Sequence, residues 1–185
     1  MKSNLKKIVM ASLLAAFACV ATMSIRIPTP GTGGYIHPGD AVVILSGVIL
    51  GPSWGLLAAG IGSAMADTIG GYFIYVPITF VIKGAVAFVA GMIYRNMGKT
   101  SKSRYAAVIL SGAADMVLVA GGYFLCEWPL YGIAAAAASV PANIIQGIGG
   151  LVIGIILYPV LIAVPDVRRI AQETGTQTQR PVSGE

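Results

Sequence analysis

The charged residues of this chain are confined to a few short segments, and long apolar stretches separate them. Only 10% of the 185 residues are charged, whereas 56% are hydrophobic and the mean hydropathy is +0.82. A soluble domain normally carries about 25% charged residues, and so few charges cannot cover a water-facing surface. We therefore expect an all-α integral membrane protein whose apolar segments cross the lipid bilayer.

Six apolar segments can be separated by their polar or Pro- and Gly-rich boundaries. We expect spans near residues 5–25, 39–50, 54–70, 77–94, 105–125 and 141–164. At about 20 residues per span, these six helices leave no room for a separate soluble domain. Residues 1–165 are predicted to form the membrane domain, and residues 166–185 a polar tail that we expect to be disordered. The alanine run 134–138 fits either an extension of the sixth helix or an interfacial turn.

The basic residues predict how the helices are oriented. Ten of the twelve Lys and Arg residues lie in the N-terminal segment, in the loop after the fourth span or in the tail. Six spans place these three regions on one side, so that only Arg26 lies in an outer segment. The positive-inside rule then puts both termini in the cytoplasm. Basic residues in this distribution do not form the stripe with interleaved aromatics that is typical of nucleic-acid binding.

No group of residues has the spacing of a catalytic or metal centre. The two cysteines, Cys19 and Cys126, are interpreted as inert small hydrophobic residues. His37 has no partner at metal-ligand spacing, and the sequence contains no HExxH motif, phosphate-binding glycine loop or nucleophile elbow. We therefore expect a binding protein without enzyme activity, metal or cofactor.

Three ionisable residues lie within the predicted spans, namely Asp67, Lys83 and Asp115. Charge inside a bilayer is expensive, so such residues normally face the interior of the bundle and pair with one another. We expect Lys83 to pair with Asp67 or Asp115. This network either fixes the helix register or flanks a substrate. Asp40, at the start of the second span, is placed to interact with the positive end of that helix.

Polar and aromatic residues also gather near the outer ends of the last two spans. Asn143 and Gln146 are three residues apart and share a helix face. Their amides suit hydrogen bonding to a polar ring, and they also suit contacts between packed helices. Glu127 and Trp128 lie in the link before the sixth span. Trp beside a carboxylate favours stacking on a ring with hydrogen-bond donors, although a Trp there can also serve as a membrane anchor.

Taken together, four segments resemble the S components of energy-coupling-factor (ECF) vitamin transporters: 35–41 (YIHPGDA), 50–55 (LGPSWG), 66–72 (ADTIGGY) and 77–84 (PITFVIKG). The similarity covers roughly residues 5–165. It implies six helices with cytoplasmic termini and high-affinity binding of a vitamin or precursor near the outer face. It also implies two partners, a transmembrane coupling subunit and a pair of cytoplasmic ATPases. The Ala-x-x-x-Ala face that meets the coupling subunit in this family is matched by Ala11 and Ala15.

The resemblance also implies where the ligand binds, because the first loop and spans four to six build the pocket in this family. The expected substrate-binding residues are Tyr35, His37, Lys83, Glu127, Trp128, Asn143 and Gln146. These groups suit a pyridoxine-like or hydroxymethylpyrimidine-like ring. Two other interpretations stay open, a self-sufficient ion-coupled carrier that uses the buried charges as a relay, and a membrane-embedded lipid-modifying enzyme. Each of these places the protein in the cell membrane of a prokaryote.

Overall fold

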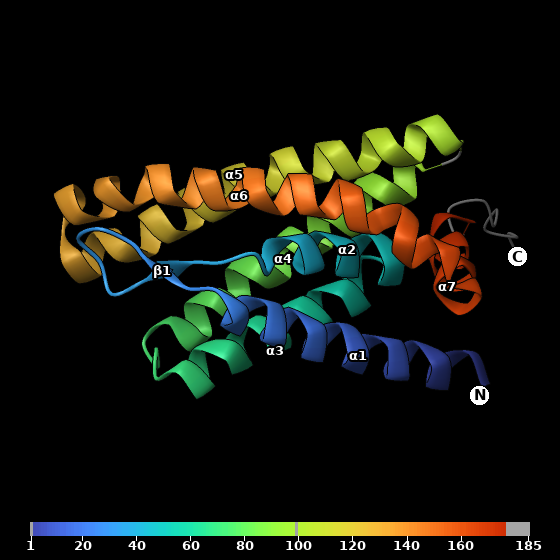
Figure 1. Ribbon diagram of the computed structural model, residues 1–185, viewed down its shortest axis with the longest axis horizontal. Coiled ribbons are helices and arrows are strands. Elements are labelled where there is room, and N and C mark those ends of the chain that lie inside the picture. The colour runs from blue at the N-terminus through green and yellow to red at the C-terminus, as the bar shows by residue number, and fades with distance from the viewer. Residues whose placement is uncertain (1, 99, 177–185) are drawn as a thin grey trace, which may run out of the picture.

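The computed structural model describes residues 2–98 and 100–176, which form an elongated bundle of helices (Figure 1). The helices within these residues are α1 (Lys2–Ser24), α2 (Asp40–Leu50), α3 (Pro52–Gly70), α4 (Tyr75–Met97), α5 (Ser101–Tyr131), α6 (Ile133–Ala163) and α7 (Pro165–Thr176). A short antiparallel hairpin, β1 (Ile27–Pro28) and β2 (Tyr35–Ile36), pairs Ile27 with Ile36 in the loop between α1 and α2. The all-helical prediction is confirmed.

The connections lie at the two ends of the bundle (Figure 1). One end, which we call the basic end, holds the start of α1, the α4–α5 connection and α7. An ion pair of 2.9 Å between Lys6 and Asp166 joins α1 to α7 there. The opposite end, which we call the hairpin end, holds β1, β2 and the α3–α4 and α5–α6 turns. The predicted basic segments therefore meet at one end, although Lys99 and Arg180 lie outside the described residues.

Among the described residues, four helices are long and apolar enough to cross a membrane: α1 from Asn4, α4, α5 and α6. The protein is thus a membrane protein, and the count of six spans stays a prediction. α2 differs from the other predicted spans because its 11 residues rise only about 16 Å, whereas the hydrocarbon core is about 30 Å thick. Every residue of α2 is buried. This helix therefore forms the centre of the bundle, with the longer helices around it.

Glycines allow the helices to approach this centre closely. A Cβ at Gly47 of α2 would clash with the carbonyl oxygen of Ala87 in α4, and one at Gly62 of α3 would clash with the backbone of Ala15 in α1. The Ala-x-x-x-Ala face of α1 is consequently used inside the chain. Ala11 is 8% exposed and the backbone of Ala15 packs on α3. Neither alanine is freely exposed, and their expected contact with a coupling subunit stays a prediction.

The last two long helices extend further toward the hairpin end than expected. We ended the fifth span at residue 125 because polar residues and Pro129 follow, but α5 continues to Tyr131. Glu127 and Trp128 are therefore helical residues. The alanine run 134–138 is an extension of the sixth helix, because α6 begins at Ile133 and includes this run. Gly132, with φ +86°, makes the turn between these helices, in a conformation that favours glycine.

The segment after residue 165 corrects another expectation. We predicted disorder from residue 166, but residues 165–176 form α7. Its buried side chains have the spacing of one helix face and are Val167, Ile170, Ala171 and Thr174. The Thr174 hydroxyl donates a hydrogen bond of 3.3 Å to the Ile49 carbonyl at the end of α2. The apolar periodicity of α7 is short and surrounded by charges, and for this reason we missed it. Residues 177–185 of the predicted tail lie outside the described residues.

Candidate functional site

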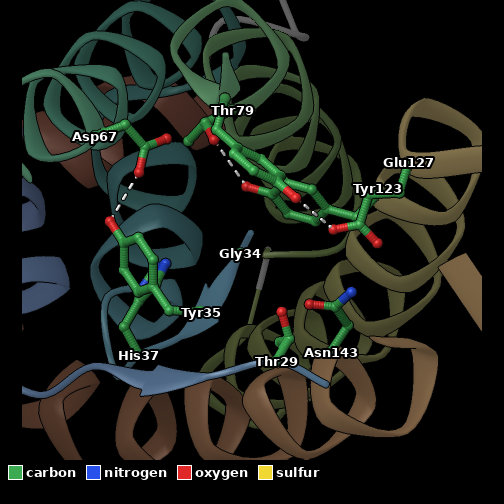
Figure 2. Close-up of a pocket in the computed structure, with 10 residues that line it drawn as sticks. Thr29, Gly34, Tyr35, His37, Asp67, Thr79, Tyr123, Glu127 and Asn143 are labelled. Atoms are coloured by element: carbon green, nitrogen blue, oxygen red, sulfur yellow. Dashed lines mark hydrogen bonds between the residues drawn. The ribbon is translucent and has the colours of Figure 1, made fainter. Parts of the chain in front are cut away.

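A small cavity lies at the hairpin end, where the first loop (residues 25–39) covers α3, α4, α5 and α6 (Figure 2). The loop contributes part of its lining, and four helices contribute the rest: Thr29, Gly34, Tyr35, His37, Asp67, Tyr75, Thr79, Tyr123, Glu127 and Asn143. Its volume is about 20 Å³, which is enough for a single water molecule. A vitamin-sized ligand would therefore fit only after the first loop moves.

Glu127 of α5 is the most firmly held polar group of this cavity. Its side chain is 2% exposed, and its Oε1 accepts a hydrogen bond of 3.0 Å from the Tyr75 hydroxyl. The Ser139 hydroxyl of α6 donates to its other oxygen at 2.5 Å. Tyr123 lies one turn earlier on the same face of α5. Two hydroxyls from neighbouring helices thus orient an acceptor that is otherwise available to a ligand.

Asp67 lies on the opposite side of the cavity from Glu127 (Figure 2). Its Oδ1 accepts a hydrogen bond of 2.7 Å from the Tyr35 hydroxyl, whereas its buried Oδ2 has no hydrogen-bond partner among the described residues. The neighbouring Thr79 hydroxyl pairs with Tyr123 at 3.0 Å. A buried carboxylate oxygen without a donor is costly. Asp67 is therefore suited to accept a hydrogen bond from a ligand.

The first loop is held over the cavity by Tyr35 and Arg26. The Arg26 guanidinium lies 5.0 Å from the ring centre of Tyr35 and 5.7 Å from that of Tyr72, distances typical of cation–π contacts. It also donates a hydrogen bond of 3.3 Å to the carbonyl of Ala66 in α3. Burial, followed by the hydrogen bond to Asp67, raises the pKa of Tyr35 well above its usual value. The phenol therefore stays protonated and keeps donating to Asp67.

His37 anchors the end of the loop as a neutral side chain. Burial lowers its pKa to about 3, and this effect outweighs the attraction of Asp40. The Nδ1 atom accepts a hydrogen bond of 3.0 Å from the backbone N–H of Gly39. The backbone N–H of His37 donates to Gln146 Oε1 at 2.9 Å. Gln146 thus ties the loop to α6.

The buried ion pair beneath the cavity differs from both of the pairings that we predicted. Lys83 pairs with Asp40, with 2.5 Å between Nζ and Oδ1, and both side chains are fully buried. Gln146 Nε2 donates to the other oxygen of Asp40 at 2.7 Å. Asp115 is also fully buried, yet its carboxyl oxygens have no hydrogen-bond partner among the described residues. The predicted pairing of Lys83 with Asp67 or Asp115 is wrong because α2, which carries Asp40, packs directly on α4.

Of the seven predicted substrate-binding residues, the structure places four in the cavity lining: Tyr35, His37, Glu127 and Asn143. Gln146 and Lys83 lie behind the lining, connected to each other through Asp40. Trp128 lies outside the cavity. It is 49% exposed, and its ring packs against Phe124 with 6.1 Å between ring centres. The aromatic rings of the cavity are tyrosines instead.

Several lining residues were not predicted as ligand contacts, most importantly Tyr75, Thr79 and Tyr123. Tyr123 could have been found from its four-residue spacing to Glu127, which places both on one helix face. We did not use this spacing because we ended the fifth helix before Glu127. Thr79 could also have been found, because it shares a helix face with Lys83 and we expected that face to point into the bundle. Asp67 was identified as a buried charge but not as part of the cavity.

The lining is therefore acidic and rich in hydroxyls. Two carboxylates are present, and among the described residues no Lys or Arg lines the cavity. His37 is neutral. Ionised carboxylates only accept hydrogen bonds, whereas the Asn143 amide both donates and accepts. These groups select a neutral or cationic ligand that carries several N–H or O–H donors.

Comparison with known proteins gives matches over most of the chain. The family model of the ECF-type riboflavin transporter S component matches residues 2–163. An uncharacterized protein in a gap 3′ region of Pyrococcus woesei is 38% identical over 135 residues, which cover 73% of this chain and 87% of that protein. The thiamine precursor transporter HmpT of Lactococcus lactis subsp. cremoris (strain MG1363) is 26% identical over 159 residues, with 85% and 89% covered.

Two solved structures share the fold. The S component of a bacterial ECF transporter superposes with a TM-score of 0.66 at 22% identity, over 86% of this chain and 97% of that chain. The S component for biotin from an ECF-type ABC transporter gives a TM-score of 0.53 at 18% identity, over 85% and 93%. At these identities the likeness concerns the fold alone.

Proposed function

Because the chain belongs to the family of ECF-type riboflavin transporter S components, we propose that it is the substrate-binding subunit of an ECF-type ABC importer for a vitamin or vitamin precursor. The observation that carries this proposal is the cavity at the hairpin end. It lies between the first loop and four helices, and it contains a buried glutamate oriented by two hydroxyls. The family consists of transporter subunits rather than enzymes.

The ligand that suits this cavity is a small heteroaromatic ring with hydrogen-bond donors, such as a hydroxymethylpyrimidine-like or pyridoxine-like compound. Asp67 and Glu127 accept hydrogen bonds from amino or hydroxyl groups, Asn143 pairs with a ring nitrogen, and the tyrosines cover the ring faces. A carboxylate-bearing vitamin would meet two carboxylates without a cation in the lining, which is unfavourable. The thiamine precursor transporter among the relatives supports this choice of substrate class.

Ligand entry requires the first loop to leave the cavity. Opening breaks the hydrogen bond between Tyr35 and Asp67 and the one between His37 and Gln146. Arg26 is the second residue after α1, at the start of the loop. We expect it to hold this end of the loop against α3 while the rest of the loop opens. The bound ring then replaces the lost contacts with hydrogen bonds to Asp67 and Glu127. The loop closes over the ligand and excludes water.

Transport requires the partners that are implied for this family, a transmembrane coupling subunit and a pair of cytoplasmic ATPases. The orientation follows the basic residues, with the basic end in the cytoplasm of a prokaryote and the hairpin end outside. The coupling subunit docks on the outward face of α1, where Ser12 and Ala16 are exposed and four residues apart. Small residues at this spacing allow close helix contact. ATP-driven toppling of the bundle then delivers the ligand, and an unchanged tilt by crosslinking after ATP addition would refute this step.

The first experiment is mass spectrometry of small molecules released by denaturing the purified, detergent-solubilised protein. We expect a stoichiometric neutral or cationic ring compound. Calorimetric titration with hydroxymethylpyrimidine, pyridoxine, riboflavin and biotin then ranks the candidates. Binding of biotin alone would contradict the acidic-cavity argument. Uptake that persists without the ATPases would favour the ion-coupled carrier, and chemical turnover of the ligand would favour the membrane enzyme.

A further inference from the structure

Two adjoining cavities lie along α4, and neither shares a lining residue with the cavity at the hairpin end. The first, which we call the basic cavity, has a volume of about 440 Å³ and is lined by residues that include Lys7, Trp54, Met92 and Arg95. The second, which we call the apolar groove, has a volume of about 390 Å³. Phe88 lines both. Both volumes fall in the range of about 300–1,000 Å³ that is usual for ligand sites.

The apolar groove is lined only by hydrophobic residues and glycine, including Leu56, Phe80, Val81, Gly84 and Ala85. Val81 is 65% exposed, so the groove opens toward the surroundings of the bundle, which for a membrane protein is lipid. Gly84 allows the Leu56 side chain of α3 to pack closely on α4, because a Cβ at this position would lie 3.2 Å from Leu56 Cγ. The groove is therefore shaped and lined for a hydrocarbon chain.

The two cavities follow each other along α4. Phe80, Gly84, Phe88 and Met92 are four residues apart and share one helix face, and Arg95 lies one turn further toward the basic end. The rise from Phe80 to Arg95 is about 22 Å, and one leaflet including its headgroup region is about 20–22 Å thick. One molecule with a polar head at Arg95 and a tail that reaches Phe80 would therefore extend over the full depth of a single leaflet.

The basic cavity is suited to an anionic head. Lys7 lies 3.7 Å from Glu173, a long distance for an ion pair, and an ammonium group has three donors to share. The guanidinium of Arg95 has five donors, more than one partner uses, in the planar arrangement that suits phosphate oxygens. The first turn of α3 also lines this cavity, and its N-terminus has no side-chain cap within the described residues. The positive end of that helix adds to the two cations.

We propose that the basic cavity and the apolar groove together bind one anionic phospholipid. Its phosphate contacts Lys7 and Arg95, and one acyl chain lies in the groove between α3 and α4. On the orientation proposed above, this lipid belongs to the cytoplasmic leaflet. The site is separate from the cavity at the hairpin end. Through Lys7 and Arg95, the bound lipid would link α1, on which we propose that the coupling subunit docks, to α4.

The test is native mass spectrometry of the full chain in detergent after exchange with phosphatidylglycerol or with phosphatidylcholine that carries the same acyl chains. We expect one retained phosphatidylglycerol per protein and weaker retention of phosphatidylcholine. The double variant Lys7→Gln/Arg95→Gln should bind phosphatidylglycerol about tenfold more weakly, at about 1 kcal/mol or less per lost cation. The matched control is Lys102→Gln/Arg169→Gln, which removes the same charge from exposed positions outside the basic cavity.

A second pair of variants tests the groove. Ala85→Leu fills it and should reduce phosphatidylglycerol retention, whereas Ala106→Leu adds the same atoms to an exposed position of α5 and should leave retention unchanged. Equal retention of the two lipids, or equal losses in both charge variants, would overturn the proposal. It would also fail if Lys7→Gln/Arg95→Gln kept the lipid but lost co-purification with the coupling subunit, because this face would then bind a protein. Size-exclusion elution and the melting temperature establish that each variant is folded.

Discussion

The Lys83–Asp40 pair gives the sharpest test of the buried network. In Lys83→Met the Asp40 carboxylate stays fully buried without its cation, and only the Gln146 amide still donates to it. Removing one partner of a buried ion pair costs about 3–5 kcal/mol. For the protein in detergent, we expect this loss in the free energy of unfolding to lower the midpoint of thermal unfolding clearly, as measured by intrinsic fluorescence.

The double variant Asp40→Asn/Lys83→Met removes both charges and should recover most of that loss, because a neutral amide can still pair with Gln146. Asp115→Asn serves as the matched control. Since neither oxygen of Asp115 has a hydrogen-bond partner among the described residues, we expect it to change stability by about 1 kcal/mol or less. If Asp115→Asn destabilised the protein as much as Lys83→Met, and Asp40→Asn did not, Lys83 would pair with Asp115 and our reasoning would be refuted.

Three further predictions concern the cavity, the first loop and the coupling surface. Glu127→Gln should weaken ligand binding about 10- to 100-fold in calorimetric titration, the usual loss for a charge-assisted hydrogen bond, while Trp128→Phe outside the cavity should not change it. His37 stays neutral in the folded protein because its pKa is lowered to about 3, whereas the unfolded chain takes up this proton below about pH 6.5. Its contribution to stability is complete above that pH and falls as the pH decreases toward 3, by about 2 kcal/mol at pH 5. His37→Gln should flatten this dependence in thermal unfolding, and an unchanged pH profile would contradict it. Ala16→Trp should abolish co-purification with the coupling subunit and keep ligand binding. Val117→Trp, at an exposed position of α5, is its control and should affect neither.

The sequence was sufficient for features that depend on composition and on spacing along one helix. The membrane class, the helical fold and the inward position of Asp67, Lys83 and Asp115 follow from the cost of polar groups in lipid. It was not sufficient for contacts between helices. Asp40 looked like a helix-end residue, and nothing local indicated that α2 crosses α4 beside Lys83. Such a pairing depends on which helices are neighbours, and a single sequence does not contain this information.

The candidate site residues show the same difference between features that depend on spacing in the sequence and features that depend on the folded helices. Tyr35, His37, Glu127 and Asn143 line the cavity, as we expected from the first loop and from the polar residues near the outer ends of the last two spans. Their contact with a ligand stays a prediction. Trp128 lies outside the cavity that we expected it to line, because the direction of its side chain depends on helix phase. Once α5 extends through residue 131, the cavity face of this helix is fixed by Tyr123 and Glu127, and the next residue must point about 100° away from it.

The short central helix connects the first loop to the core of the bundle. α2 begins at Asp40, only three residues after His37 of the loop. Gln146 bonds both the backbone of His37 and the carboxylate of Asp40, and Asp40 bonds Lys83 of α4. Opening the loop breaks the first of these contacts and leaves the other two. Lys83, Asp40 and Gln146 thus connect α2, α4 and α6 without the loop, and we expect the bundle to keep its packing when the loop opens.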